Sequence, residues 1–146
     1  MKRFQFDLTR VLDWRRQQLE LEQVKLEPML GELSVRKSRI AQCEAERREL
    51  RRPVAFSGSA EAQDLAAAER YWLHLGGRSR NLAAELAACE QRILQQRERI
   101  ARARQRLRLL EQLEQRRRDE WQTGVDREQE ALAAELYLAR RKDPSE

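Results

Sequence analysis

Apolar residues recur at intervals of seven in two stretches of this chain, and that spacing limits what the chain can fold into. The first stretch carries Leu12, Leu19, Leu26, Leu33 and Ile40. The second carries Leu65, Trp72, Ser79, Leu86, Ile93, Ile100 and Leu107. A seven-residue apolar repeat keeps a narrow stripe on one side of a helix, where a second helix can cover it. Each stretch is therefore predicted to form one long helix of a coiled coil.

The residues three positions after each of these determine how well the stripe can close. In the second stretch they are Ala68, Leu75, Leu82, Cys89, Gln96, Ala103 and Leu110. In the first stretch they are Arg15, Glu22, Met29, Arg36 and Cys43, and the same spacing of seven continues to Leu50. Of these residues in the first stretch, Arg15, Glu22 and Arg36 are charged. We therefore expect the seam to be looser at the start of the first helix and better sealed towards Leu50.

A single break separates the two stretches, so one chain can supply both strands of the coiled coil. Pro53 disfavours a helical conformation in the residue before it, and Ser57-Gly58-Ser59 follows shortly after. We predict an all-α fold with a single coiled-coil domain over residues 1–146, a long antiparallel two-helix hairpin. The first helix is expected over about residues 7–52, the turn over 53–59, and the second helix over about 60–141.

Two features inside the predicted helices could interrupt them. Pro28 removes a backbone hydrogen bond and is expected to bend the first helix. The adjacent Gly76 and Gly77 cost roughly 2 kcal/mol of helix propensity relative to alanine. They predict either a kink or a break, and a break would leave a short helix over about residues 60–75 at the tip of the hairpin. Asp7 or Thr9 is expected to cap the first helix.

The composition and the motifs indicate that the chain has no catalytic site. Charged residues make up 38% of the chain and aromatic residues only 5%, a balance typical of long helices and coiled coils. No glycine-rich phosphate loop is present, and His74 is the only histidine. We expect no enzymatic activity, no catalytic, cofactor-binding or metal-binding residues, and no cofactor.

Cysteine usage and hydropathy predict a cytoplasmic protein. Cys43 and Cys89 both occupy apolar positions of the repeat, where reduced core residues are expected rather than a disulfide. The start of the sequence lacks the apolar region of a secretory signal, and no stretch resembles a membrane span.

Basic residues are concentrated in one part of the second helix. The net charge is +5, and residues 91–118 carry ten arginines against three glutamates. A stripe that includes Arg102, Arg104 and Arg108 could attract an acidic protein surface or nucleic acid. A solvated coiled-coil face is the simpler interpretation, and we expect no nucleic acid partner because no aromatic platform accompanies the stripe.

The second predicted helix is much longer than the first. If both leave the turn together, the last 35 or so residues extend past the start of the first helix. Trp121, Val125, Leu132 and Leu136 continue an apolar stripe there. Such a helix is poorly stable alone, which predicts a docking surface for a partner or for another copy of this chain.

Three segments together resemble one known family. They are Phe4-x-Phe6-x-Leu8-x-x-Val11-Leu12-x-x-Arg15-Arg16, then residues 106–117 (RLRLLEQLEQRR), then Asp119-Glu120-Trp121. Their order and positions, the break near residue 55 and the basic balance resemble the flagellar type III export stalk proteins, the FliJ family. The resemblance covers nearly the whole chain.

The resemblance implies a soluble stalk component of the flagellar type III protein export apparatus, peripherally associated with the inner-membrane export machinery. Members of this family form an antiparallel coiled coil similar to the stalk of rotary ATPases. The implied partners are the hexameric export ATPase, the export-gate membrane protein and export chaperones, with no small-molecule substrate. Three alternatives stay open: the equivalent stalk of a virulence secretion system, a basic nucleic-acid-binding coiled coil, and a homodimeric structural protein.

The stalk interpretation predicts two partner-binding ends. The end that faces the ATPase would contain Phe4, Phe6, Trp121, Leu132 and Leu136. The tip that faces the export gate would contain Leu50, Tyr71, Trp72 and Leu75. Tyr71 and Trp72 are neighbours on a helix, so only one can lie in the seam. Trp72 has the phase of the repeat, and Tyr71 is therefore expected to point outward.

Overall fold

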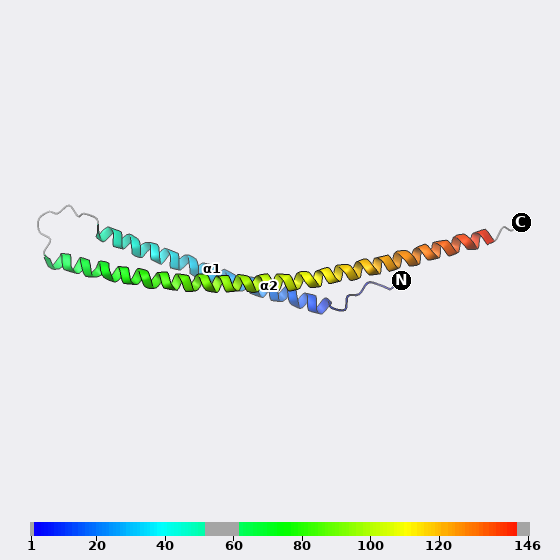
Figure 1. The fold of residues 1–146 in the computed structure, drawn as a ribbon, viewed down its shortest axis with the longest axis horizontal. Coiled ribbons are helices and arrows are strands. Elements are labelled where there is room, and N and C mark those ends of the chain that lie inside the picture. Colours follow the sequence, from blue (N-terminus) through cyan, green and yellow to red (C-terminus); the bar gives the residue numbers. More distant parts are fainter. Residues whose placement is uncertain (1, 52–61, 143–146) are drawn as a thin grey trace. The chain divides into compact units, whose positions relative to one another are not determined.

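Two helices account for nearly all of the structure. The computed structural model describes residues 2–51 and 62–142. Helix α1 spans Thr9–Leu50 (42 residues) and helix α2 spans Ala62–Lys142 (81 residues). Both helices are labelled in Figure 1. The all-α prediction is confirmed, and the helix bounds differ from the predicted ones by about two residues. The predicted turn over residues 53–59 lies outside the described residues.

The chain divides into two compact units, and both helices contribute to each. One unit comprises residues 21–101, and the other comprises residues 1–20 with 102–146. The prediction of a single domain stays a prediction.

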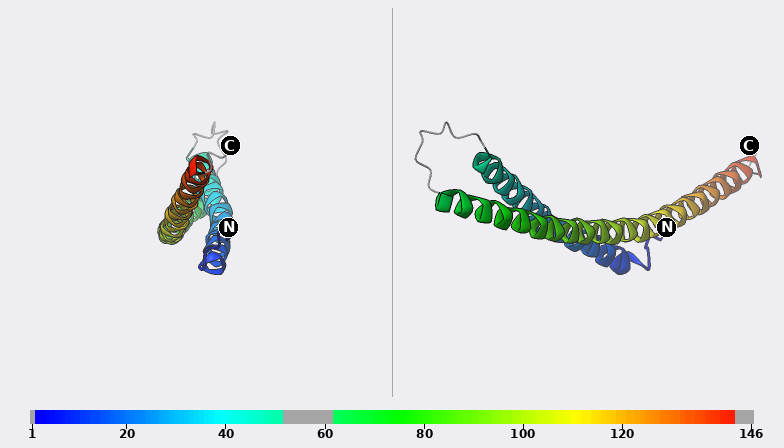
Figure 2. Two further views of the ribbon diagram at one scale, coloured as in Figure 1. Left: turned by 90° about the vertical axis from the view of Figure 1, so that its right-hand side faces the viewer. Right: turned by 60° about the vertical axis from the view of Figure 1, so that its left-hand side comes forward.

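Within residues 21–101, the two helices lie side by side and run in opposite directions (Figures 1 and 2). The amide of Gln96 contacts Glu22, the thiol of Cys89 points to the carbonyl of Met29, and the thiol of Cys43 donates to the carbonyl of Leu75. Each advance of seven residues along α1 is matched by a retreat of seven along α2. The antiparallel heptad pairing predicted for this region is therefore confirmed.

The core of this unit is built from residues of the predicted repeat. Cys43, Leu75 and Leu82 form a buried cluster, and Ile40 and Leu50 pack partly buried against it. Further along α2, the buried residues are Cys89, Ile93, Gln96 and Ile100. Both cysteines are free and buried, as expected of core residues.

The helices continue through the residues that were expected to interrupt them. Helix α1 contains Pro28 without ending there, and the bend predicted at that position stays a prediction. Helix α2 runs unbroken through Gly76 and Gly77, so the alternative of a separate tip helix is wrong. Two glycines cost too little to break an 81-residue helix whose neighbouring turns bury Leu75 and Leu82.

The unit formed by residues 1–20 and 102–146 is also antiparallel. Leu12 is its buried α1 residue, Arg16 forms an ion pair with Glu111 at 3.8 Å, and the ring of Phe4 lies against that of Trp121. The hydroxyl of Thr9 donates a 2.6 Å hydrogen bond to the carbonyl of Phe6. Thr9 therefore ties the helix start to the preceding segment. Among the described residues, neither Asp7 nor Thr9 accepts a hydrogen bond from a later backbone N–H, so the predicted cap is not formed.

Candidate partner-binding surfaces

An aromatic cluster joins the N-terminal segment to α2. The ring centroids of Phe4 and Trp121 lie 5.9 Å apart with a tilt of 57°. The indole N–H of Trp121 donates to the carbonyl of Lys2 at 3.1 Å, and the guanidinium of Arg118 lies 5.2 Å from the centre of the Phe4 ring. Phe4 and Trp121 are both half-buried. Two of the residues predicted for the ATPase-facing end are thus brought into contact with each other.

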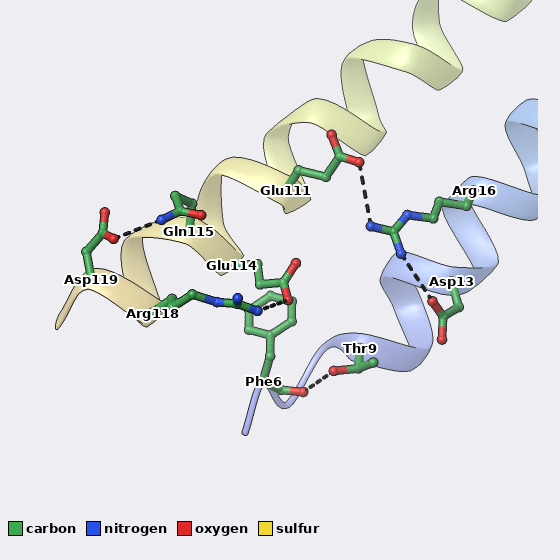
Figure 3. Close-up of polar contacts among 9 residues, drawn as sticks. All are labelled: Phe6, Thr9, Asp13, Arg16, Glu111, Glu114, Gln115, Arg118 and Asp119. Atoms are coloured by element: carbon green, nitrogen blue, oxygen red, sulfur yellow. Dashed lines mark hydrogen bonds and ion pairs between the residues drawn. The ribbon is translucent and has the colours of Figure 1, made fainter. Parts of the chain in front are cut away.

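Phe6, the third of these residues, lies beside the same part of α2. Phe6, Glu114 and Arg118 line one groove. Within α2, the guanidinium of Arg118 donates a hydrogen bond to the carboxylate of Glu114 at 3.4 Å (Figure 3). Arg16 lies between Asp13 and Glu111 and forms an ion pair with each (Figure 3). Arg16 thus joins α1 to α2. The contacts of Lys2, Phe4 and Phe6 bring the segment before α1 against α2, so cover for α2 extends as far as Trp121.

Beyond this cluster, α2 continues as an exposed helix. Every residue from 126 to 142 is exposed, including Leu132 (57%) and Leu136 (64%). We call this stretch the distal segment. It is shorter than the 35 or so uncovered residues expected from the helix lengths, because residues before α1 cover part of α2. Leu132 and Leu136 are therefore not brought together with Phe4, Phe6 and Trp121.

The predicted arginine stripe is on the surface of the same unit. Arg102, Arg104 and Arg108 are all exposed, and Arg102 takes part in an electrostatic or hydrogen-bonding interaction. The stripe can therefore contribute charge to an encounter with a partner.

Within residues 21–101, the predicted tip residues have different environments. Tyr71 is 47% exposed, as expected, and its hydroxyl donates to Glu46 at 3.1 Å. This bond to a carboxylate raises the pKa of Tyr71. Leu75 is only 1% exposed and Leu50 packs against the same core cluster. Leu75 therefore cannot join Tyr71 in a contact surface, and Leu50 is partly buried, because the heptad positions that place them near the tip also turn them into the seam.

Trp72 lies in the seam and is held by two arginines, one in α1 and one directly after its end. The guanidinium carbons of Arg47 and Arg51 each lie 3.8 Å from the centre of its ring. A Cβ added at Gly76 would lie 2.9 Å from the Nη2 atom of Arg47, so the absence of a side chain there makes room for the guanidinium. The Nε atom of Arg47 is buried without a hydrogen-bond partner among the described residues. Stacking on the indole therefore accounts for how this charged group is accommodated.

This arrangement was not foreseen from the sequence. The sequence predicts a kink or a break at the glycine pair, whereas Gly76 serves a contact between α1 and α2. Two features of the sequence are consistent with this contact. Trp72 and Gly76 lie one helical turn apart, and the end of the first helix is rich in arginine, with Arg47, Arg48 and Arg51.

A polar pair crosses the seam at the middle of α2. Gln96 is 2% exposed, and its amide nitrogen donates to the carbonyl of Glu22 at 2.9 Å and to its carboxylate at 2.6 Å. The hydrogen bond from Gln96 is the main reason that the pKa of Glu22 is lowered. Both residues occupy repeat positions where apolar residues are usual, so their pairing favours one register of the two helices.

Neither a metal site nor a membrane span emerges from the described residues. No three metal-ligating side chains gather within residues 2–51 and 62–142. In the same residues, no helix combines the length and apolar character needed to cross a bilayer. The candidate binding surfaces are the aromatic cluster, the distal segment and the surface around Tyr71. Comparison of the chain with protein-family models, with curated proteins and with solved structures gave no match.

Proposed function

We propose that this chain is a stalk component of the flagellar type III export apparatus and binds the hexameric export ATPase. The observation that carries the proposal is the distal segment, a helix that exposes Leu132 and Leu136 directly beyond an aromatic cluster. The resemblance of the sequence to the export stalk family supplies the identity of the partner. Association with the inner-membrane export machinery is part of the same proposal.

The physical argument concerns the stability of a single helix. A helix of this length is marginal in water unless its apolar face is covered. A partner that receives the helix in a groove or a ring would cover that face, with leucines at helical spacing as anchors. The aromatic cluster supports this role because it holds the base of the helix, so that less order has to be gained on binding.

The proposal extends to the export gate and to export chaperones through the surface around Tyr71. Tyr71 is exposed, and its ring stacks on that of His74 with centroids 6.3 Å apart. Amphipathic aromatic residues are enriched among the residues that dominate binding at protein interfaces.

The test measures binding of the purified full-length chain to the purified hexameric ATPase by isothermal titration calorimetry. The double variant Leu132→Ala/Leu136→Ala is expected to weaken binding at least tenfold, because hot-spot truncations commonly cost about 2 kcal/mol. The matched control is Leu73→Ala/Leu94→Ala, which removes two leucines of comparable exposure (57% and 52%) from residues 21–101. Equal losses in both variants, or no binding to the ATPase, would refute the proposal.

A nucleic-acid-binding protein is the second candidate, and the ten arginines of residues 91–118 favour it. Titration with duplex DNA at increasing salt distinguishes the two. Tight binding whose logarithm falls steeply and linearly with the logarithm of salt concentration would support the second candidate.

A further inference from the structure

The two ends of the distal segment carry opposite charges. Asp126, Glu128 and Glu130 outnumber Arg127 near its start, and Arg140, Arg141 and Lys142 form its end. Asp126 accepts a hydrogen bond from Gln122 at 2.8 Å within the helix. No ion pair among the described residues engages the other two acidic residues or the three basic residues at the end, although α2 uses such pairs elsewhere, as between Glu114 and Arg118. These charges are available to a binding partner.

The stripe of the segment that contains Leu132 and Leu136 has a symmetric spacing. It runs through Gln129, Leu132, Leu136 and Ala139 in steps of three, four and three residues. Read in the opposite direction from the same midpoint, near residue 134, the steps are unchanged. A stripe of this kind can face a copy of itself across a two-fold axis, as in an isologous interface.

We propose that a second copy of this chain binds the distal segment in antiparallel orientation. The two-fold axis lies beside residue 134, so that Leu132 packs against Leu136 of the second copy and Gln129 against its Ala139. On the two edges of the stripe, Asp126 then faces Arg140 of the second copy, and Glu128 faces its Lys142. Symmetry repeats each contact, which gives four oppositely charged pairs around the four leucines.

One pair opposes the association. Glu135 lies on an edge of the stripe next to the axis, so it faces Glu135 of the second copy. Like charges at facing positions destabilise a helix pair. With a short stripe and this repulsion, the proposed dimer is weak and reversible.

Self-association goes beyond the proposed function and does not depend on it. If the export ATPase binds Leu132 and Leu136, it competes with the second copy for the same surface. In the dimer, this surface is then covered until the ATPase binds. The experiment below contains no ATPase, so its failure leaves the proposed function to its own test.

The experiment is sedimentation equilibrium of the full-length chain over a range of concentrations, with circular dichroism as a control for helix content. The variant Asp126→Lys/Glu128→Lys makes both ends basic, and Arg140→Glu/Lys142→Glu makes both ends acidic. Each variant alone is expected to dimerise about tenfold more weakly than the parent, since four flanking pairs become repulsive. An equimolar mixture of the two is expected to associate at least as tightly as the parent.

A third variant tests the axis. Glu135→Gln removes the repulsion and is expected to tighten the dimer about twofold, whereas Glu90→Gln, an exposed position in residues 21–101, leaves it unchanged. The proposal is overturned if parent and Glu135→Gln are both monomeric at millimolar concentration. It is equally overturned if dimerisation is unaffected by the charge variants, or if the mixture fails to associate.

Discussion

The seam of residues 21–101 and the distal segment belong to the same helix α2 and share the same spacing of apolar residues, yet their burial is opposite. In the seam, Leu75 is 1% exposed and Leu82 is buried, whereas Leu136 in the distal segment is 64% exposed. The difference lies in whether an α1 residue is available opposite each position. A heptad repeat therefore defines which face of a helix can be covered, and the length of the opposing chain determines how much of it is covered.

Polar residues within the repeat show the same contrast. Gln96 is buried because Glu22 offers two acceptors across the seam. Gln129, a glutamine on the stripe of the distal segment, is exposed. A buried amide needs partners at defined positions, so Gln96 contributes to the choice of register, and an exposed one does not.

The largest expected effect tests the comparison directly. Leu75→Ala should lower the free energy of unfolding by about 2–5 kcal/mol, because it removes a fully buried side chain. Leu136→Ala should change it by less than about 0.5 kcal/mol. Urea denaturation at low protein concentration, where the chain is monomeric, measures both. Similar losses in the two variants would mean that the distal segment is covered within one chain.

A second comparison uses adjacent residues on one turn. Trp72→Ala should cost about 2 kcal/mol or more, because it removes a seam residue and the ring that holds Arg47 and Arg51. Tyr71→Ala should cost less than about 1 kcal/mol, because only an exposed ring and an exposed hydrogen bond are lost. Thermal denaturation gives the stability order.

Binding of the export gate should follow the reverse order, with Tyr71→Ala the more damaging. If binding tracks stability in both variants, Tyr71 is not a contact residue.

Substitutions at the glycine pair test the contact between Gly76 and Arg47. Gly77→Ala should raise stability by about 1 kcal/mol, because nothing lies within 4 Å of the added Cβ. Gly76→Ala should gain less, since its Cβ displaces the guanidinium of Arg47 from Trp72. In an Arg47→Ala background the two substitutions should become equivalent. A difference that persists in that background would assign the effect to the backbone.

The smallest expected effect is a pH dependence of the seam. The pKa of Glu22 is lowered below its ordinary value of 4.5 in the folded chain, mainly by the hydrogen bond from Gln96. Its contribution to stability is therefore present above the unfolded pKa and is lost as the pH falls through the folded pKa. Urea denaturation between pH 6 and pH 3 should show this loss in the parent and a flatter profile in Glu22→Gln.

Gln96→Ala removes the cause of the shift and should flatten the profile as well. An unchanged profile in both variants would exclude this pair as a source of the acid sensitivity.

Much of the fold follows from local patterns. The repeat of seven and the break within it predicted both helices, their antiparallel pairing and the burial of Cys43 and Cys89. The adjacency of Tyr71 and Trp72 predicted that one points outward, and the phase identified which. These features were accessible because helical periodicity is a property of residues close together in the sequence.

The sequence by itself determined two long helices, the faces they bury and the sidedness of Tyr71. Tertiary structure alone decided that the segment around Phe4 covers α2 as far as Trp121, that Gly76 admits Arg47 beside Trp72, and that Gln96 bonds to Glu22. The physical reason is that each of these contacts joins residues of the two helices or of the segment before α1. Such contacts depend on which residues the register places opposite one another, and a periodic pattern is compatible with several registers.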